Sequence, residues 1–223
     1  KTLTIAHIVD YLYRKGQNVI ISCYTHRAIS EVTKKISEFN SGIPIYRIGN
    51  HKDPNCSLLE DKINNQYGLS ARVSTANMII DSHPVYIGTT HAWLSGRYDS
   101  LFKDDNKYDV SIIDEASQVI LPNALGVIRL SEKFILVGDH NQLPPVILSN
   151  EARDLRKTLF ETLFNNPKTP ESCKVMLDIQ HRMPEAISEF ISKEFYNGKL
   201  FGSEDAISRT LDNIDLKESI YMK

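Results

Sequence analysis

The chain alternates short apolar runs with segments in which apolar residues recur at helical spacing. Apolar positions repeat every three or four residues from Leu3 to Leu12, with Gly16 as a stop, which predicts a helix. The same spacing from Ala28 to Ile36 predicts a second helix. Further helices are predicted at 121–130, 155–164 and 184–195, and strands at 18–23, 43–49, 84–90, 110–114, 133–139 and 174–180.

This alternation predicts an α/β fold with a central parallel sheet covered by helices on both faces. Residues 50–82 are polar and mixed, and they predict a helical insertion. Ligands of such folds bind beyond the carboxyl ends of the strands. Polar residues gather at these predicted strand ends: Ser22, Thr89, Thr90, Asp114, Asp139, Gln142 and Gln180.

The composition, with 41% hydrophobic and 24% charged residues, is typical of a globular protein. No apolar run approaches the ~20 residues that cross a bilayer, and no signal peptide opens the chain, so we expect no membrane contact. The three cysteines lie far apart, which indicates a reducing compartment and no metal held by protein ligands alone. A net charge of −2 indicates that nucleic acid would be bound through a few placed groups, or with help from another segment.

Two adjacent acids, Asp114 and Glu115, end one of the predicted strands. Taken alone, they are better explained by a strand that reaches solvent. They also match the needs of nucleotide hydrolysis, because an aspartate can hold phosphate-bound Mg²⁺ and a neighbouring glutamate can activate the attacking water. The surrounding sequence has to decide between these interpretations.

Two further strand ends favour a nucleotide site. Asp139 ends the next predicted strand, and Gln142 follows in a loop stiffened by two prolines. A glutamine amide can donate to a γ-phosphate and accept from the attacking water. Arg182 follows a third strand end, where a guanidinium can stabilise charge on the γ-phosphate. The alternative for Arg182 is a surface ion pair with Glu185 or Glu189.

The first two residues, Lys1 and Thr2, stand directly before a predicted helix. A P-loop ends in Gly-Lys-Ser/Thr at such a position, with the lysine on the phosphates and the hydroxyl on Mg²⁺. We therefore expect the sequence GxxxxG to precede Lys1 in the intact protein. Its absence there would weaken the interpretation as an ATPase.

Several motifs, in this order, resemble those of superfamily 1B helicases. They are "SCYTHRAI" at 22–29, "IGTTHAW" at 87–93, "DEASQ" at 114–118, "GDHNQLPPV" at 138–146 and "QHRM" at 180–183. Together with "LPNALG", "NEARDL" and "TLFETLF", they are most similar to the eukaryotic replication nuclease-helicases, which trim Okazaki-fragment flaps and resect DNA ends. His181 departs from the family pattern "YRM", which argues against a stacking role for this residue.

The resemblance implies a RecA-like P-loop domain, called 1A, over residues 1–183, and the start of a second one, called 2A, over residues 184–223. The implied cofactors are ATP and Mg²⁺. A nuclease domain and an iron–sulfur cluster would belong only to parts of the protein outside this chain. By itself, the chain would bind nucleotide weakly and hydrolyse little or none of it.

The resemblance also implies roles for single residues. Those that would bind the nucleotide are Lys1, Thr2, Asp114, Gln118 and Asp139, with Mg²⁺ held by Thr2 and Asp114. Those that would act in catalysis are Glu115, Gln142 and Arg182. Those that would contact a single strand are Thr25, Arg27, Thr89 and Thr90. For Thr25 and Thr89 the alternative is capping at a strand end, and Trp93 is expected in the core rather than stacked on a base.

We therefore expect a core segment of an ATP-dependent DNA helicase that moves on single-stranded DNA. The resemblance implies replication and repair proteins as partners and the nucleus as location, with the mitochondrion as a second one. One alternative is an RNA helicase of the same superfamily, because contacts to the 2′-hydroxyl alone separate RNA from DNA. The other alternative is an inactive P-loop scaffold, against which the intact set of catalytic residues argues.

Overall fold

The computed structural model describes residues 1–59, 61, 83–96 and 108–209 of the chain. It divides into two compact units, Lys1–Thr169 and Pro170–Lys223. The sequence places the boundary between 1A and 2A after residue 183 instead, and this assignment stays a prediction. Within the described ranges, no helix combines the length and the apolar character needed to cross a membrane.

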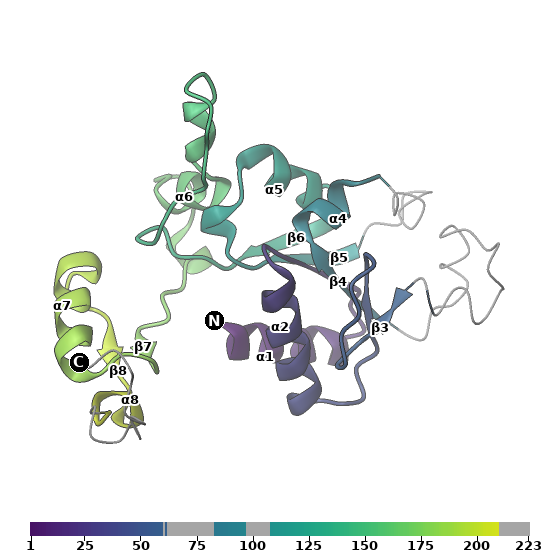
Figure 1. Cartoon of the computed structure of the whole chain (residues 1–223), viewed down its shortest axis with the longest axis horizontal. Helices are drawn as coiled ribbons and strands as arrows, with labels where there is room; N and C mark the ends of the chain where they lie inside the picture. The colour runs from purple at the N-terminus through teal and green to yellow at the C-terminus, as the bar shows by residue number, and fades with distance from the viewer. Residues whose placement is uncertain (60, 62–82, 97–107, 210–223) are drawn as a thin grey trace, which may run out of the picture. The chain divides into compact units, whose positions relative to one another are not determined.

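The first unit is built on a six-stranded sheet with the order β3-β2-β4-β1-β5-β6, in which every neighbouring pair is parallel (Figure 1). Its strands are β1 (Val19–Cys23), β2 (Ile45–Arg47), β3 (Ser57–Leu58), β4 (Val85–Thr89), β5 (Tyr108–Ile113) and β6 (Ser131–Leu136). The predicted α/β fold with a parallel sheet is confirmed.

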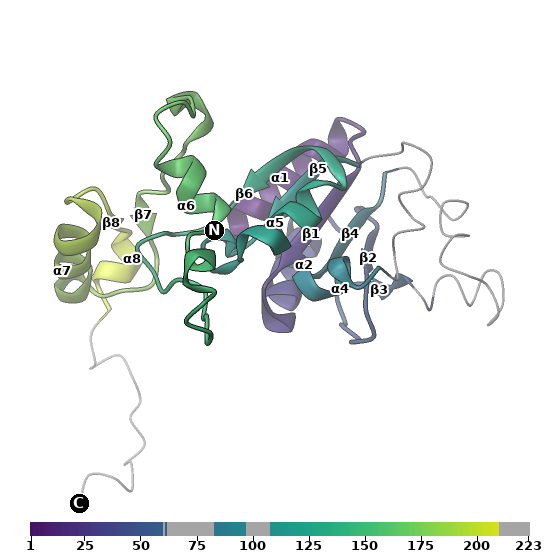
Figure 2. The same ribbon diagram turned by 90° about the horizontal axis from the view of Figure 1, so that it is seen from above.

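Helices cover both faces of this sheet, as Figures 1 and 2 show for the two helix pairs α1/α2 and α4/α5. The helices of this unit are α1 (Thr2–Arg14), α2 (His26–Phe39), α4 (Thr90–Leu94), α5 (Leu121–Ile128) and α6 (Leu159–Phe164). Because side chains alternate along a strand, Val19 and Ile21 of β1 pack in the core under α1 and α2. Ile20 packs in the second core, with residues of α4 and α5.

The second unit contains a two-stranded parallel sheet of β7 (Ile179–Gln180) and β8 (Phe201–Gly202). Helix α7 (Glu185–Tyr196) follows β7, and helix α8 (Glu204–Ile207) follows β8. Short 3-10 helices span Ala116–Gln118 and Arg153–Arg156 in the first unit and Glu171–Cys173 in the second.

Three predicted elements differ from the structure. The strand predicted at 174–180 is wrong over 174–178, because only Ile179–Gln180 pair with another strand. The helix predicted at 155–164 is interrupted at Thr158, whose extended backbone begins α6 and whose hydroxyl accepts a hydrogen bond from the Glu161 N–H. In the predicted insertion at 50–82, Ser57–Leu58 form β3 instead of a helix, and residues 60 and 62–82 lie outside the described residues.

Candidate functional site

The carboxyl ends of the central strands meet at one edge of the sheet, as the pattern predicts. The backbone N–H of Asp114, after β5, donates to the carbonyl of Ser22 in β1 over 2.8 Å. The Ser22 hydroxyl in turn lies 3.0 Å from that of Thr90, which follows β4, and both are buried. Predicted site residues from three separate motifs therefore share this edge.

Lys1 and Glu115 are in direct contact although they lie far apart in the sequence. The Lys1 Nζ is 2.5 Å from the Glu115 Oε1, so the beginning of α1 meets the end of β5. Glu115 adopts a left-handed backbone conformation, with φ 51° and ψ 40°, which is uncommon for a residue other than glycine. Its second oxygen, Oε2, is buried and accepts no hydrogen bond within the described residues. This conformation turns the carboxylate toward the first turn of α1.

Asp114 is buried, with 6% of its surface exposed. Burial, and after it the charge of Glu115, raises the pKa of the Asp114 carboxyl, while Lys1 opposes this rise. A buried carboxylate beside a second one is a place where a cation is favourable. Carboxylate and hydroxyl oxygens are ligands that Mg²⁺ accepts, and Thr2 opens the helix that Lys1 caps. The chemistry of Asp114 and Thr2 therefore suits a phosphate-bound Mg²⁺, and its binding by these two residues stays a prediction.

The loop after β6 is held against the loop after β5 by Ser117. A Cβ on Gly138 would lie 2.9 Å from the Ser117 backbone nitrogen, so only glycine allows this close approach. The Asp139 N–H donates to the Ser117 hydroxyl over 3.1 Å, and the Gln142 amide donates to the Asp139 carboxylate over 2.8 Å. Ser117 belongs to the motif "DEASQ", but nothing in the sequence predicts that its hydroxyl holds the loop after β6. Gln118 closes the same 3-10 turn, its N–H donating to the carbonyl of Glu115.

Arg182 lies in the second unit, where its side chain is exposed. Within the described residues it forms no ion pair with Glu185 or Glu189, the alternative considered for it. Gln180 stabilises the turn that contains Arg182. The Gln180 side-chain oxygen accepts hydrogen bonds from the backbone N–H groups of Arg182 and Met183 over 2.8 and 2.6 Å. A contact between Arg182 and the γ-phosphate stays a prediction.

The threonines predicted to contact a single strand are tied to helix ends. Thr25 caps α2, and its hydroxyl accepts from the Ala28 N–H over 3.1 Å; Thr89 caps α4 in the same way through Ala92. The hydroxyl of Thr90 is buried against Ser22, so a phosphate contact at this residue would involve its backbone N–H. These observations support capping and leave strand binding as a prediction.

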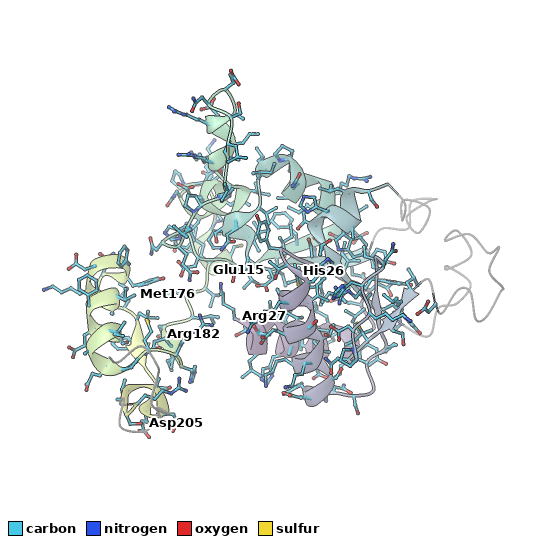
Figure 3. All side chains as sticks on the ribbon, viewed as in Figure 1. His26, Arg27, Glu115, Met176, Arg182 and Asp205 are labelled. Carbon is cyan, nitrogen blue, oxygen red and sulfur yellow. The ribbon has the colours of Figure 1, made fainter. Side chains whose placement is uncertain are left out.

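Arg27 and Trp93 differ sharply in exposure. Arg27 lies in the first turn of α2 with 90% of its side chain exposed, 3.6 Å from Glu31 (Figure 3). Trp93 is 1% exposed and donates its indole N–H to the carbonyl of Ile21 over 3.0 Å. The expectation that Trp93 belongs to the core is confirmed.

Two kinds of comparison show which known proteins this chain is similar to. Two family models, each described as an AAA domain, match residues 59–150 and 155–222 and together span most of the chain. DNA replication ATP-dependent helicase/nuclease DNA2 of Homo sapiens is 30% identical over 222 residues, and that of Saccharomyces cerevisiae is 35% identical over 225. These alignments cover 96% and 95% of this chain but 20% and 14% of the relatives.

An uncharacterised ATP-dependent helicase of Methanocaldococcus jannaschii is 46% identical over 114 residues, which are 51% of this chain and 17% of the relative. The chain belongs to the AAA-domain helicase family that these models and relatives define, and the resemblance to superfamily 1B helicases is confirmed. It spans about a fifth of the length of the first relatives that it matches.

Proposed function

We propose that the chain is the ATP-hydrolysing core segment of a DNA helicase that moves on single-stranded DNA. The observation that carries this proposal is the contact between Lys1 and Glu115 at the carboxyl edge of the sheet. It joins the predicted end of a P-loop to the predicted catalytic acid, next to the buried Asp114. The relatives that cover the same region carry the name ATP-dependent helicase/nuclease.

In the proposed mechanism, Lys1 neutralises phosphate charge, while Thr2 and Asp114 hold Mg²⁺. A metal held there would supply positive charge that offsets the negative charge of the phosphates while the γ-phosphoryl group passes from ADP to water. Glu115 accepts a proton from the attacking water through Oε2, the carboxylate oxygen that has no hydrogen-bond partner among the described residues. The water itself attacks in line with the leaving group.

Gln142 and Arg182 complete this proposal. The Gln142 amide already donates to Asp139, and a rotation about its side chain would let it contact the γ-phosphate and report on hydrolysis. By the family resemblance, Arg182 would stabilise charge on the γ-phosphate. Conformational changes on ATP binding and release would then drive stepping of the intact protein along the strand.

The single strand would be bound through its phosphates at the sheet edge that holds Thr25, Arg27, Thr89 and Thr90. Backbone N–H groups at the first turns of α2 and α4 are suited to this task, because they contact phosphate oxygens without reading sequence. DNA as the substrate, a role in replication and repair and a location in the nucleus are inferred from the relatives' names. A nuclease activity or an iron–sulfur cluster would belong to other parts of the intact protein.

The substitution Glu115→Ala in the intact protein tests the catalytic assignment. We expect ATP hydrolysis to fall at least ~100-fold, as for the loss of a general base, while ATP still binds. Steady-state hydrolysis and equilibrium binding of a fluorescent ATP analogue measure the two effects. Glu38→Ala, which removes an exposed carboxylate at the end of α2, is the matched control and should leave both unchanged. Retained turnover in Glu115→Ala would contradict the assignment.

A further inference from the structure

A buried arginine lies beneath the loop that begins α2. Arg47 is the last residue of β2 and is 1% exposed. Its Nη1 lies 3.4 Å from the Asp53 Oδ2, and its Nη2 lies 2.7 Å from the His26 Nδ1. The Asp53 carboxylate also accepts from the hydroxyl of Ser30 on α2. One guanidinium therefore joins β2, the loop after it and the first turn of α2.

The contact with Arg47 fixes the protonation state of His26. A guanidinium can only donate hydrogen bonds, so the His26 Nδ1 must accept and cannot carry a proton. Partial burial, and then the charges of Arg47 and His51, lower the pKa of His26, in agreement with a neutral ring. The ring is thus held as the tautomer with its proton on Nε2, the nitrogen directed away from Arg47.

The remaining face of His26 belongs to the edge of the proposed strand-binding site. His26 is exposed, follows the cap residue Thr25 and precedes the exposed Arg27 (Figure 3). The His51 ring stacks on it, with centroids 4.7 Å apart and planes at 18°, and restrains its orientation. Because Asp53 neutralises Arg47, the buried guanidinium contributes orientation rather than charge to this surface.

We propose that His26 is a further contact to the single strand, donating its Nε2–H to a phosphate oxygen, and that Arg47 is the positioning residue that fixes this donor. The inference rests on the proposed function, since it names a group within the same strand-binding edge. The backbone N–H groups of His26 and Arg27, which lie before the first hydrogen bond within α2, would bind the same phosphate. A neutral donor with a fixed tautomer binds a phosphate without the cost of removing a proton or reorienting the ring.

Equilibrium binding of fluorescently labelled oligothymidylate to the intact protein tests the contact. We expect His26→Ala to weaken binding about tenfold, as for one hydrogen bond to a charged group, and His26→Gln to restore part of it because its amide can donate from a similar position. His7→Ala, the same substitution at an exposed histidine of α1, is the control and should change nothing. Unchanged binding in His26→Ala would overturn the inference alone, whereas no binding by the unaltered protein would overturn the proposed function as well.

Nitrogen NMR of the histidine rings tests the role of Arg47, because the shifts of Nδ1 and Nε2 report the tautomer. The variant Arg47→Met with Asp53→Asn removes the guanidinium without leaving a buried unpaired charge. In this variant we expect His26 to change from the pure Nε2–H form to a mixture of the two tautomers. Binding of oligothymidylate should weaken, and adding His26→Ala to the variant should not weaken it further. A proton on Nδ1 in the unaltered protein, or losses that add independently, would show that Arg47 does not act through His26.

Discussion

At the scale of the residue, the site contains groups that suit catalysis but lower the free energy of unfolding. Glu115 occupies a left-handed conformation, and Asp114 is buried beside it with a raised pKa. Such positions persist where the surrounding structure enforces them, and they are common at functional sites. Both features can be tested by measuring stability and binding in the same variants.

The substitution Asp114→Asn should stabilise the protein and impair its site. Because the pKa of Asp114 is raised in the folded protein, the unfolded chain releases the Asp114 proton at a lower pH than the folded one. The free energy of unfolding therefore falls as the pH rises above the ordinary pKa of an aspartate. At neutral pH the neutral amide should therefore raise the melting temperature, while Mg²⁺-dependent ATP binding is lost. Calorimetry and ATP binding measure the two effects, with Asp154→Asn at an exposed aspartate as control. A lower melting temperature in Asp114→Asn would contradict this account of the buried carboxyl.

His26 should make stability depend on pH below neutrality. Its pKa is lowered in the folded protein, where Arg47, His51 and Asp53 surround it, so the unfolded chain takes up the proton first as the pH falls. Its contribution is complete above the ordinary pKa of histidine and is lost as the pH falls through that value toward the lowered one. Urea unfolding between about pH 7.5 and pH 5 should show a smaller decline for His26→Gln than for the unaltered protein. Equal declines would contradict the structure of this cluster.

The sequence pattern singles out Asp114, Glu115 and Gln142 as candidates because each follows an apolar strand, and ligands of parallel sheets bind at the carboxyl ends of the strands. It could not identify Arg47 as a buried residue, since a charged side chain in a short strand is usually expected to reach solvent. The two partners of Arg47 come from α2 and from the loop after β2, and their meeting depends on the tertiary structure.

At the scale of the element, the sequence predicted β1, β2, β4 and β5 well, because these strands are short, largely apolar runs that are mostly buried, whereas it missed the short strand β3. The segment 174–178 has similar residues but finds no neighbouring strand within the described chain, and Val175 is 83% exposed. An apolar run becomes a strand only when its backbone groups find partners. The interruption at Thr158 was missed because the apolar spacing continues across it.

Variants of Thr25 separate its role as a helix cap from its predicted role in strand binding. Thr25→Ala should lower the free energy of unfolding by about 1 kcal/mol, through loss of the hydrogen bond from the Ala28 N–H. Thr25→Asp keeps a capping oxygen and adds a favourable charge at the helix N-terminus, so stability should be preserved. The same charge should repel phosphates and weaken binding of single-stranded DNA. Urea unfolding and fluorescence anisotropy measure the pair, and undiminished DNA binding by Thr25→Asp would remove Thr25 from the interface.

At the scale of the whole molecule, the chain spans about a fifth of the length of the first relatives that it matches. The proposed catalytic and strand-binding residues are therefore only part of what a protein of that length contains. Nucleotide hydrolysis, strand binding and their coupling are therefore properties to measure in the intact protein. The net charge of −2 agrees with the proposal that a strand is bound through a few placed groups rather than through a strongly basic surface.

The steady-state ATPase rate of the intact protein, with single-stranded DNA and single-stranded RNA of equal length, tests the central claim most directly. We predict strong stimulation by DNA and little by RNA, with Glu115→Ala inactive in both cases. Equal or greater stimulation by RNA would identify an RNA helicase of the same superfamily instead. The absence of turnover with either strand would contradict the account, because the motifs would then serve only as structure.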